Sequence, residues 1–131
     1  MTAVFPSWKF AAPDTVAAFG LHGCCLVGPP RRISGNDADE WFRCLPSFGI
    51  ALIRDDVVMD RGISANVLDG PLSALRHLVD LLADDPHNSQ LEAGEIISTG
   101  TLTRALPIKP GETWRTELTG VPLEGIRVAL T

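Results

Sequence analysis

The sequence has few cysteines, no cluster of basic residues and no long apolar run, and each scarcity excludes a class of protein. No apolar stretch approaches the about 20 residues that a membrane helix needs. The segment Met1–Phe10 has one lysine and no apolar core, so it does not resemble a secretory signal. The eleven basic residues are scattered and the net charge is −5, whereas phosphate binding needs a basic face. We therefore expect a cytoplasmic protein that binds neither nucleic acid nor a membrane.

The three cysteines give no sign of a metal site or of a disulfide framework. Cys24, Cys25 and Cys44 form an odd set without metal-ligand spacing. We expect them to be reduced, buried thiols with a structural role. The length of 131 residues, 45% of them hydrophobic, fits one domain with a modest core.

Glycine and proline divide the chain into short elements, which favours strands and turns over helices. Arg54-Asp55-Asp56 can form the turn of a hairpin between two apolar stretches. The expected strands are Leu21–Val27, Phe48–Ile53, Val57–Met59, Glu95–Thr99, Thr113–Leu118 and Gly125–Leu130. Many strands and one main helix indicate the α+β class.

That helix is predicted over Pro71–Ala83. Proline suits the first turn, and Asp69 stands where an N-cap carboxylate would accept backbone hydrogen bonds. Apolar residues recur at helical spacing and form one stripe that should face the core: Leu72, Leu75, Leu78, Val79 and Leu82.

The stretch Arg61–Thr103 carries a recognisable order of short motifs. Val67-Leu68 is followed by Gly70-Pro71-Leu72, then by the apolar helix, and finally by L-E-A-G-E-I-I-S-T-G, which ends at Gly100. This order resembles the hydratase/decarboxylase branch of the fumarylacetoacetate hydrolase superfamily, which includes 2-hydroxypenta-2,4-dienoate hydratases and 4-oxalocrotonate decarboxylases. The resemblance implies a β-roll core, with a curved mixed sheet and the helix at about 71–83 packed against it. It covers residues 1–131 as a single domain similar to the C-terminal half of the family.

The resemblance also implies a divalent metal held by acidic ligands, which we expect to lie upstream of Met1. The local acidic group Asp37, Asp39 and Glu40 is more typical of a solvated loop than of a metal site. We therefore expect no metal ligands within the chain and no cofactor. Mg²⁺ or Mn²⁺ would bind only if a partner chain supplied the ligands.

Two segments match the family's substrate pocket. Asp14–Ala17 reads D-T-V-A as in the family, but Ala18 and Phe19 then replace an Asp-Asn pair and would form an apolar wall. Thr99, Gly100 and Thr101 match the loop that approaches the substrate, where glycine permits close approach and the hydroxyl groups offer hydrogen bonds. These five residues are the candidate substrate-binding residues. No catalytic residue is assigned.

Three functions remain open. The first is a truncated 2-keto-4-pentenoate hydratase-like lyase that depends on a partner chain for its metal ligands. The second is a divergent enzyme that acts on small 2-oxo or polyketide-like acids by a route other than the family's metal-dependent mechanism. The third is a non-catalytic accessory subunit of a hydratase or decarboxylase complex. All three predict a homo-oligomer or a hetero-oligomer with a hydratase-like chain, because half of a family core would leave apolar surface exposed.

Overall fold

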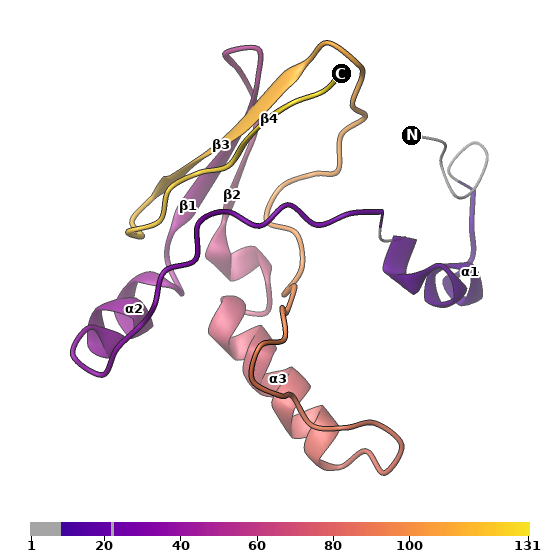
Figure 1. The fold of residues 1–131 in the computed structure, drawn as a ribbon, viewed down its shortest axis with the longest axis vertical. Helices are drawn as coiled ribbons and strands as arrows, with labels where there is room; N and C mark the ends of the chain where they lie inside the picture. The colour runs from indigo at the N-terminus through magenta and orange to yellow at the C-terminus, as the bar shows by residue number, and fades with distance from the viewer. Residues whose placement is uncertain (1–8, 22) are drawn as a thin grey trace.

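The computed structural model describes residues 9–21 and 23–131. Its elements form a small sheet and separate helices, which lie to one side of the sheet or extend away from its end (Figure 1). Along the chain they are α1 (Ala12–Ala17), η2 (Phe19–Leu21), α2 (Ala38–Cys44), β1 (Gly49–Arg54), β2 (Val57–Ile63), η3 (Ser64–Asn66), α3 (Pro71–Ala83), β3 (Thr113–Thr119) and β4 (Arg127–Ala129). The expected α+β class with one main helix is confirmed.

The four strands form one sheet in the order β2-β1-β3-β4. β1 and β2 are joined by a tight turn in which Asp55 and Asp56 have φ values of 46° and 65°, the left-handed conformation that two-residue hairpin turns need. The hairpin and both later strands were expected from the sequence. A mixed sheet was also expected, but every pairing among the described residues is antiparallel, because a hairpin joins β1 to β2 and β3 runs opposite to β1.

The buried core is small and centres on β1. Ile53 is 2% exposed and Ala51 lies two residues before it on the same face of the strand. The buried apolar residues are Trp41, Phe48, Ala51, Ile53, Val67 and Trp114. They come from α2, from β1 and β3, from Phe48 just before β1 and from the turn after η3. The core therefore ties these elements together and leaves α1 and α3 outside it.

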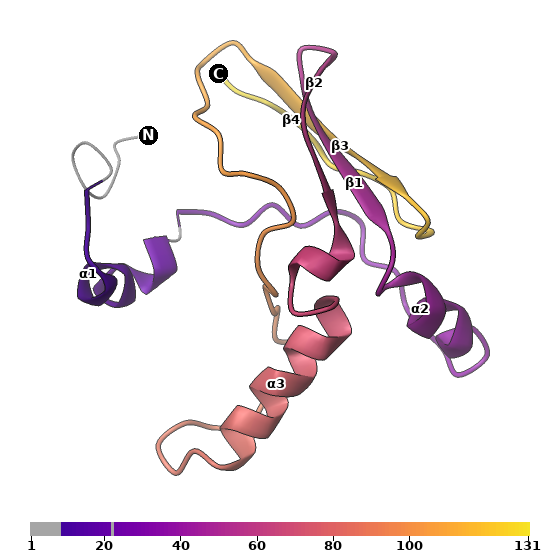
Figure 2. The ribbon, with the colours of Figure 1, turned by 180° about the vertical axis from the view of Figure 1, so that it is seen from behind.

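Helix α3 has the bounds that its sequence predicts, but its packing differs. We expected it to lie against the sheet, whereas it projects away from the sheet in both views (Figures 1 and 2), and none of its residues is fully buried. The chain turns back after α3, so that Leu91 lines a small cleft together with Val79 and Leu82 of the helix. The expected N-cap is also wrong: the N-cap residue is Gly70, and Asp69 has a φ of 62°.

Two expected strands are absent from the described part of the chain. Leu21–Val27 was expected to be one, but Leu21 belongs to η2, residues 23–27 run extended without pairing, and His22 lies outside the described residues. Glu95–Thr99 likewise forms no strand. A strand needs a neighbour for its N–H and C=O groups, and neither segment has one in the four-stranded sheet. For the same reason Cys24 and Cys25 are exposed rather than buried, while Cys44 is half-buried.

The accessible surface of the chain is 10124 Å². A compact monomer of 14.1 kDa would expose about 6,700 Å², so this surface is about half as large again. Large apolar side chains contribute to it on α1, the connecting segments and α3, including Val16, Phe19, Leu26, Val27, Leu81 and Ile96. No helix in residues 9–21 and 23–131 is long and apolar enough to cross a membrane.

Candidate functional site

The loop at residues 99–104 runs past the end of β2 and is fixed to it (Figure 2). The carbonyl of Leu102 crosses Gly62 so closely that a Cβ atom at Gly62 would overlap it. The same carbonyl accepts a hydrogen bond from Asn66 Nδ2 at 3.2 Å. A glycine inside a strand typically marks such a close backbone approach, so the sequence of β2 determines where this loop lies.

Gly100 gives the loop its shape. Its φ of 109° is a conformation that side chains with a Cβ atom rarely adopt. A Cβ atom there would lie 3.6 Å from Val67 Cγ1, which is ordinary contact. Glycine is therefore required for the backbone conformation rather than for space. Val67 is 6% exposed and forms the apolar floor under this part of the loop.

The loop presents hydrogen-bond donors to solvent. The hydroxyl of Thr101 donates to the carbonyl of Thr103 at 2.7 Å, which leaves its lone pairs available. The backbone N–H groups of residues 99–103 have no acceptor among the described residues. Gly100 and Thr101 are exposed, and Thr99 is half-buried. The N–H groups of such an exposed loop are open to water or to a bound anion.

A charged pair closes the loop. Both the backbone N–H and Nε of Arg104 donate to Asp60 Oδ2, at 2.8 and 3.2 Å, and Nη2 donates to the carbonyl of Met59 at 3.3 Å. The Arg104 backbone N–H, then its side chain, hold the pKa of the Asp60 carboxyl below its usual value. Asp60 therefore stays ionised and fixes the guanidinium against β2.

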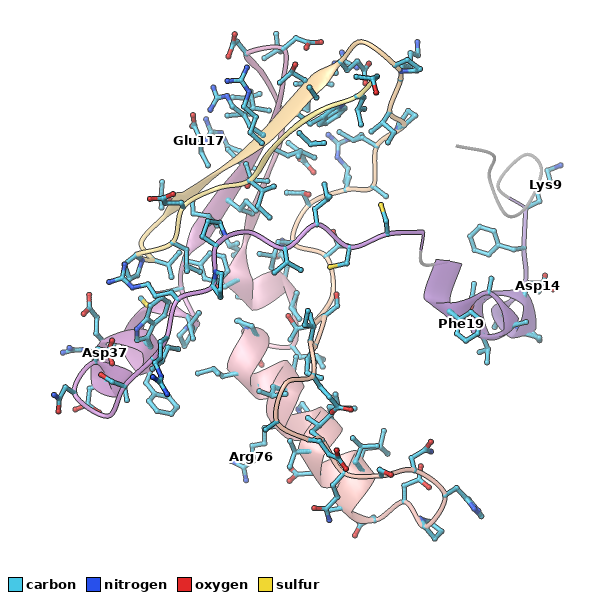
Figure 3. The ribbon with its side chains drawn as sticks, in the orientation of Figure 1. Lys9, Asp14, Phe19, Asp37, Arg76 and Glu117 are labelled. Atoms are coloured by element: carbon cyan, nitrogen blue, oxygen red, sulfur yellow. The ribbon has the colours of Figure 1, made fainter. Side chains whose placement is uncertain are left out.

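The other two expected pocket residues lie elsewhere. Phe19 is 88% exposed with a φ of 51°, and it belongs to the region of α1, apart from the sheet and the loop (Figure 3). Ala18 caps the C-terminus of α1. The structure thus brings Thr99, Gly100 and Thr101 together but does not bring Ala18 and Phe19 to them. Their role as an apolar wall stays a prediction.

The acidic residues away from the 99–104 loop accept hydrogen bonds from nearby residues in turns. Ser34 donates to Asp37 Oδ1 through its hydroxyl and its backbone N–H, both at 2.6 Å, and these bonds lower the pKa of Asp37. Asp85 accepts from Asn88 Nδ2 and the His87 N–H at 2.7 and 2.8 Å, with the Asn88 bond as the main cause of its lowered pKa. Across residues 9–21 and 23–131, no three His, Cys, Asp or Glu side chains gather as metal ligands would. The described residues therefore do not fit a divalent-metal centre.

A cavity of about 250 Å³ opens at the far end of the β1–β2 hairpin. It is lined by Asp55, Asp56, Thr113, Arg115 and Arg127. Arg115 already pairs with Asp56 at 3.6 Å and with Glu117. The cavity includes no residue of the 99–104 loop, and one of its two arginines, Arg115, already pairs with two carboxylates, so we do not assign the site to it.

Similar proteins identify the family. No protein-family model matches the sequence. The chain is 36% identical over 105 residues to the 2-oxo-hept-4-ene-1,7-dioate hydratase of Escherichia coli, an alignment that covers 79% of this chain and 36% of the relative. It is 28% identical over 116 residues to 2-keto-4-pentenoate hydratase 1 of Dechloromonas aromatica, which covers 88% of this chain and 41% of that protein.

Comparison with solved structures indicates the same family. The 4-oxalocrotonate decarboxylase of Pseudomonas putida, complexed with calcium and acetate, superposes with a TM-score of 0.59 at 30% identity, over 67% of this chain and 32% of that chain. The same enzyme complexed with magnesium and adipate gives 0.58. This chain belongs to the hydratase/decarboxylase branch of the fumarylacetoacetate hydrolase superfamily. The family resemblance read from Arg61–Thr103 is thus confirmed.

The chain spans between a third and about two fifths of the length of these hydratases. Within that span, the sequence analysis identified the loop that lies against β2. It did not identify the residues that hold the loop there. Gly62 inside a strand was a signal that another backbone passes close by. Asp60 and Arg104 are 44 positions apart, so nothing local in the sequence connects them.

Proposed function

We propose that this chain forms the carboxylate-binding side of a lyase-type site for short 2-oxo or 2-hydroxy acids. The observation that carries the proposal is the row of unpaired backbone N–H groups at residues 99–103, held in place by β2 in a chain related to hydratases. Support comes also from the relatives. One is named for a seven-carbon dioate, and the structural neighbour is complexed with acetate or adipate.

The loop would bind the substrate and orient it. Backbone N–H groups on either side of Gly100 would donate to the substrate carboxylate, and the Thr101 hydroxyl would direct its lone pairs to a hydroxyl on the ligand. Val67 would give the carbon chain an apolar floor. These contacts fix the position of the acid, so the groups that move its protons must approach from the open side of the loop.

We further propose that residues 1–131 form a single domain equivalent to the C-terminal half of a hydratase, and that polypeptide outside these residues completes the site. The large exposed surface supports this, because apolar area of that extent is usually covered by an interface. The polypeptide would be a second copy of this chain or a hydratase-like partner, and any divalent-metal ligands would come from it.

The role of the loop can be tested by calorimetric titration of the purified chain with 2-hydroxypentanoate, whose hydroxyl can donate to the lone pairs of the Thr101 hydroxyl. We expect Thr101→Val to weaken binding about threefold to tenfold, the effect of losing one hydrogen-bonding group. Thr15→Val is the matched control, because the Thr15 hydroxyl also donates to a backbone carbonyl, at 2.6 Å, but on α1.

We expect EDTA to leave this affinity unchanged, because backbone and hydroxyl groups make the contacts. If EDTA abolishes binding, an acidic site is present that these residues do not reveal. If the chain binds no 2-oxo or 2-hydroxy acid yet forms a stable complex with a hydratase, the accessory-subunit function replaces the proposal.

A further inference from the structure

We propose that residues 23–27 pair as a β-strand with the same residues of a second copy of this chain, which gives a dimer with twofold symmetry. The pairing rests on one part of the proposed function, the completion of the site by other polypeptide. It names the surface at which that polypeptide binds and selects a second copy over a hydratase-like chain. It does not depend on carboxylate binding by the 99–104 loop.

The segment 23–27 is extended but has no strand beside it. It runs between the regions of α1 and α2 (Figures 1 and 2). Its backbone N–H and C=O groups have no hydrogen-bond partner among residues 9–21 and 23–131, and all five of its residues are exposed. Unpaired N–H and C=O groups along an extended segment are a template for the addition of another strand. The segment therefore presents a free strand edge.

Contacts at its C-terminal end hold the segment in place. Gly28 lies so close to Ile126 that a Cβ atom at Gly28 would be 3.2 Å from Ile126 Cγ1. Three residues later, Arg31 Nη1 donates to the carbonyl of Pro122 at 3.4 Å. Both contacts attach the chain to the connection between β3 and β4. Because the segment is already ordered from this end, pairing costs it less conformational entropy.

The composition of the segment favours a second copy as its partner. Residues 23–30 include no charged side chain, so two copies can lie side by side without repulsion between like charges. Leu26 and Val27 are 56% and 62% exposed, whereas natural proteins commonly protect strand edges with charged residues. The chain also exposes about 3,400 Å² more than a compact monomer of its mass. Each partner in a stable interface buries about 800 Å², so this excess is sufficient for a dimer.

The prolines that follow limit the pairing and define its register. Pro29 and Pro30 have no N–H to donate, so a ladder cannot continue past Gly28. An antiparallel pair that uses all of residues 23–27 has its twofold axis at Cys25, which then faces Cys25 of the second copy. Directly opposed residues in such a pair have Cα atoms about 4.5–5.5 Å apart, which is within the range of about 4.4–6.8 Å that a disulfide spans. Cys24 instead faces a leucine.

The first test is cross-linking of the reduced, purified chain with diamide, which takes two electrons and two protons from a pair of thiols as their disulfide forms. We expect a covalent dimer from the unmodified chain and from Cys24→Ser. Cys25→Ser should give at most about a tenth as much, because only the Cys25 pair meets the distance limit. Absence of a dimer from the unmodified chain, or equal yields from the two variants, would overturn the pairing.

The second test is sedimentation velocity under reducing conditions, where no disulfide contributes. Val27→Lys places a charge within the paired segment of both copies, and we expect it to raise the dissociation constant of the dimer about tenfold or more. Phe42→Lys is the matched control, because Phe42 is an equally exposed apolar residue, at 66%, but lies on α2; it should leave the dimer unchanged.

Equal dissociation of the Val27→Lys and Phe42→Lys variants would refute the assignment of the interface. A chain that stays monomeric and associates only with a hydratase-like chain would refute the choice of a second copy. Either result leaves carboxylate binding by the 99–104 loop intact, because titration of the chain with 2-hydroxypentanoate measures that part of the proposed function separately.

Discussion

Glu112 connects three parts of the sheet region through one carboxylate. Oε2 accepts hydrogen bonds from Trp114 Nε1 and from the Lys109 N–H, both at 2.9 Å, and Oε1 faces Arg54 Nη1 at 3.5 Å. Arg54 in turn lies over the Trp114 ring, 5.8 Å from its centre. The indole bond, followed by the Lys109 bond, lowers the pKa of Glu112. Its charged form therefore stabilises the folded state.

We expect Glu112→Gln to lower the stability of the protein near neutral pH. Because the pKa is lowered in the folded state, the contribution of the carboxylate is fully present above the ordinary pKa of a glutamate and is lost as pH falls through the folded value. The difference from the unmodified protein should thus shrink as the pH falls below the ordinary glutamate pKa of about 4.3. Urea unfolding followed by tryptophan fluorescence measures it, with the exposed Glu124→Gln as control. A difference that persists undiminished in acid would contradict this role.

Gly100 gives a second prediction at the residue scale. Because alanine is strained at a φ of 109°, Gly100→Ala should cost about 1–2 kcal/mol and weaken the binding of 2-oxopentanoate. Gly35→Ala is the matched control, since its Cβ atom would meet nothing within 4 Å and its φ lies outside the left-handed region. Thermal unfolding and calorimetry together measure both effects. A Gly100→Ala protein with unchanged stability and affinity would show that the loop conformation does not matter.

The family resemblance indicated Gly100 and its threonines; by residue type alone they also fit a plain strand end with turn-forming residues. The sequence could not indicate Asp60 with Arg104, because that pair depends on where a distant loop meets β2. The proposed contact of Ala18 and Phe19 with the same site had only the family resemblance behind it. The described structure leaves those two residues near α1.

At the scale of elements, the hairpin and α3 were predictable because their signals are local. The β1–β2 turn has two acidic residues between apolar runs, and α3 begins at a proline and follows an apolar stripe. Leu21–Val27 and Glu95–Thr99 have apolar strand-like composition too. Whether such a segment becomes a strand depends on a neighbour that local sequence does not specify.

The position of α3 leads to a prediction about packing. The apolar stripe was expected to be core, and on that expectation Leu78→Ala would cost about 2–5 kcal/mol. Leu78 is only half-buried in the structure, so we now expect about 1 kcal/mol for the isolated chain. Ile53→Ala, at the centre of the sheet, should cost about 3 kcal/mol. Urea unfolding of both variants tests the contrast, and equal losses would place α3 in the core after all.

At the scale of the whole molecule, the exposed surface predicts association. The chain exposes far more area than its mass requires, and α3 presents apolar side chains such as Val79 and Leu81 to solvent. We expect the purified chain to self-associate, or to form a stable complex with a hydratase-like chain. Sedimentation velocity at micromolar concentration measures this. A monodisperse monomer that also forms no complex with such a partner would contradict the proposal that other polypeptide completes the site.

The proposed site depends on the 99–104 loop binding the carboxylate of a small acid. The most direct measurement is a map of backbone amide chemical shifts while 2-oxopentanoate is added to the isotopically labelled chain. We expect saturable shifts of the amides at residues 99–104 and of Gly62 beneath them, with the amides of Asp37, Asp39 and Glu40 unmoved. Saturable shifts centred on that acidic loop or on the cavity beside Arg115, with the 99–104 amides unchanged, would contradict it.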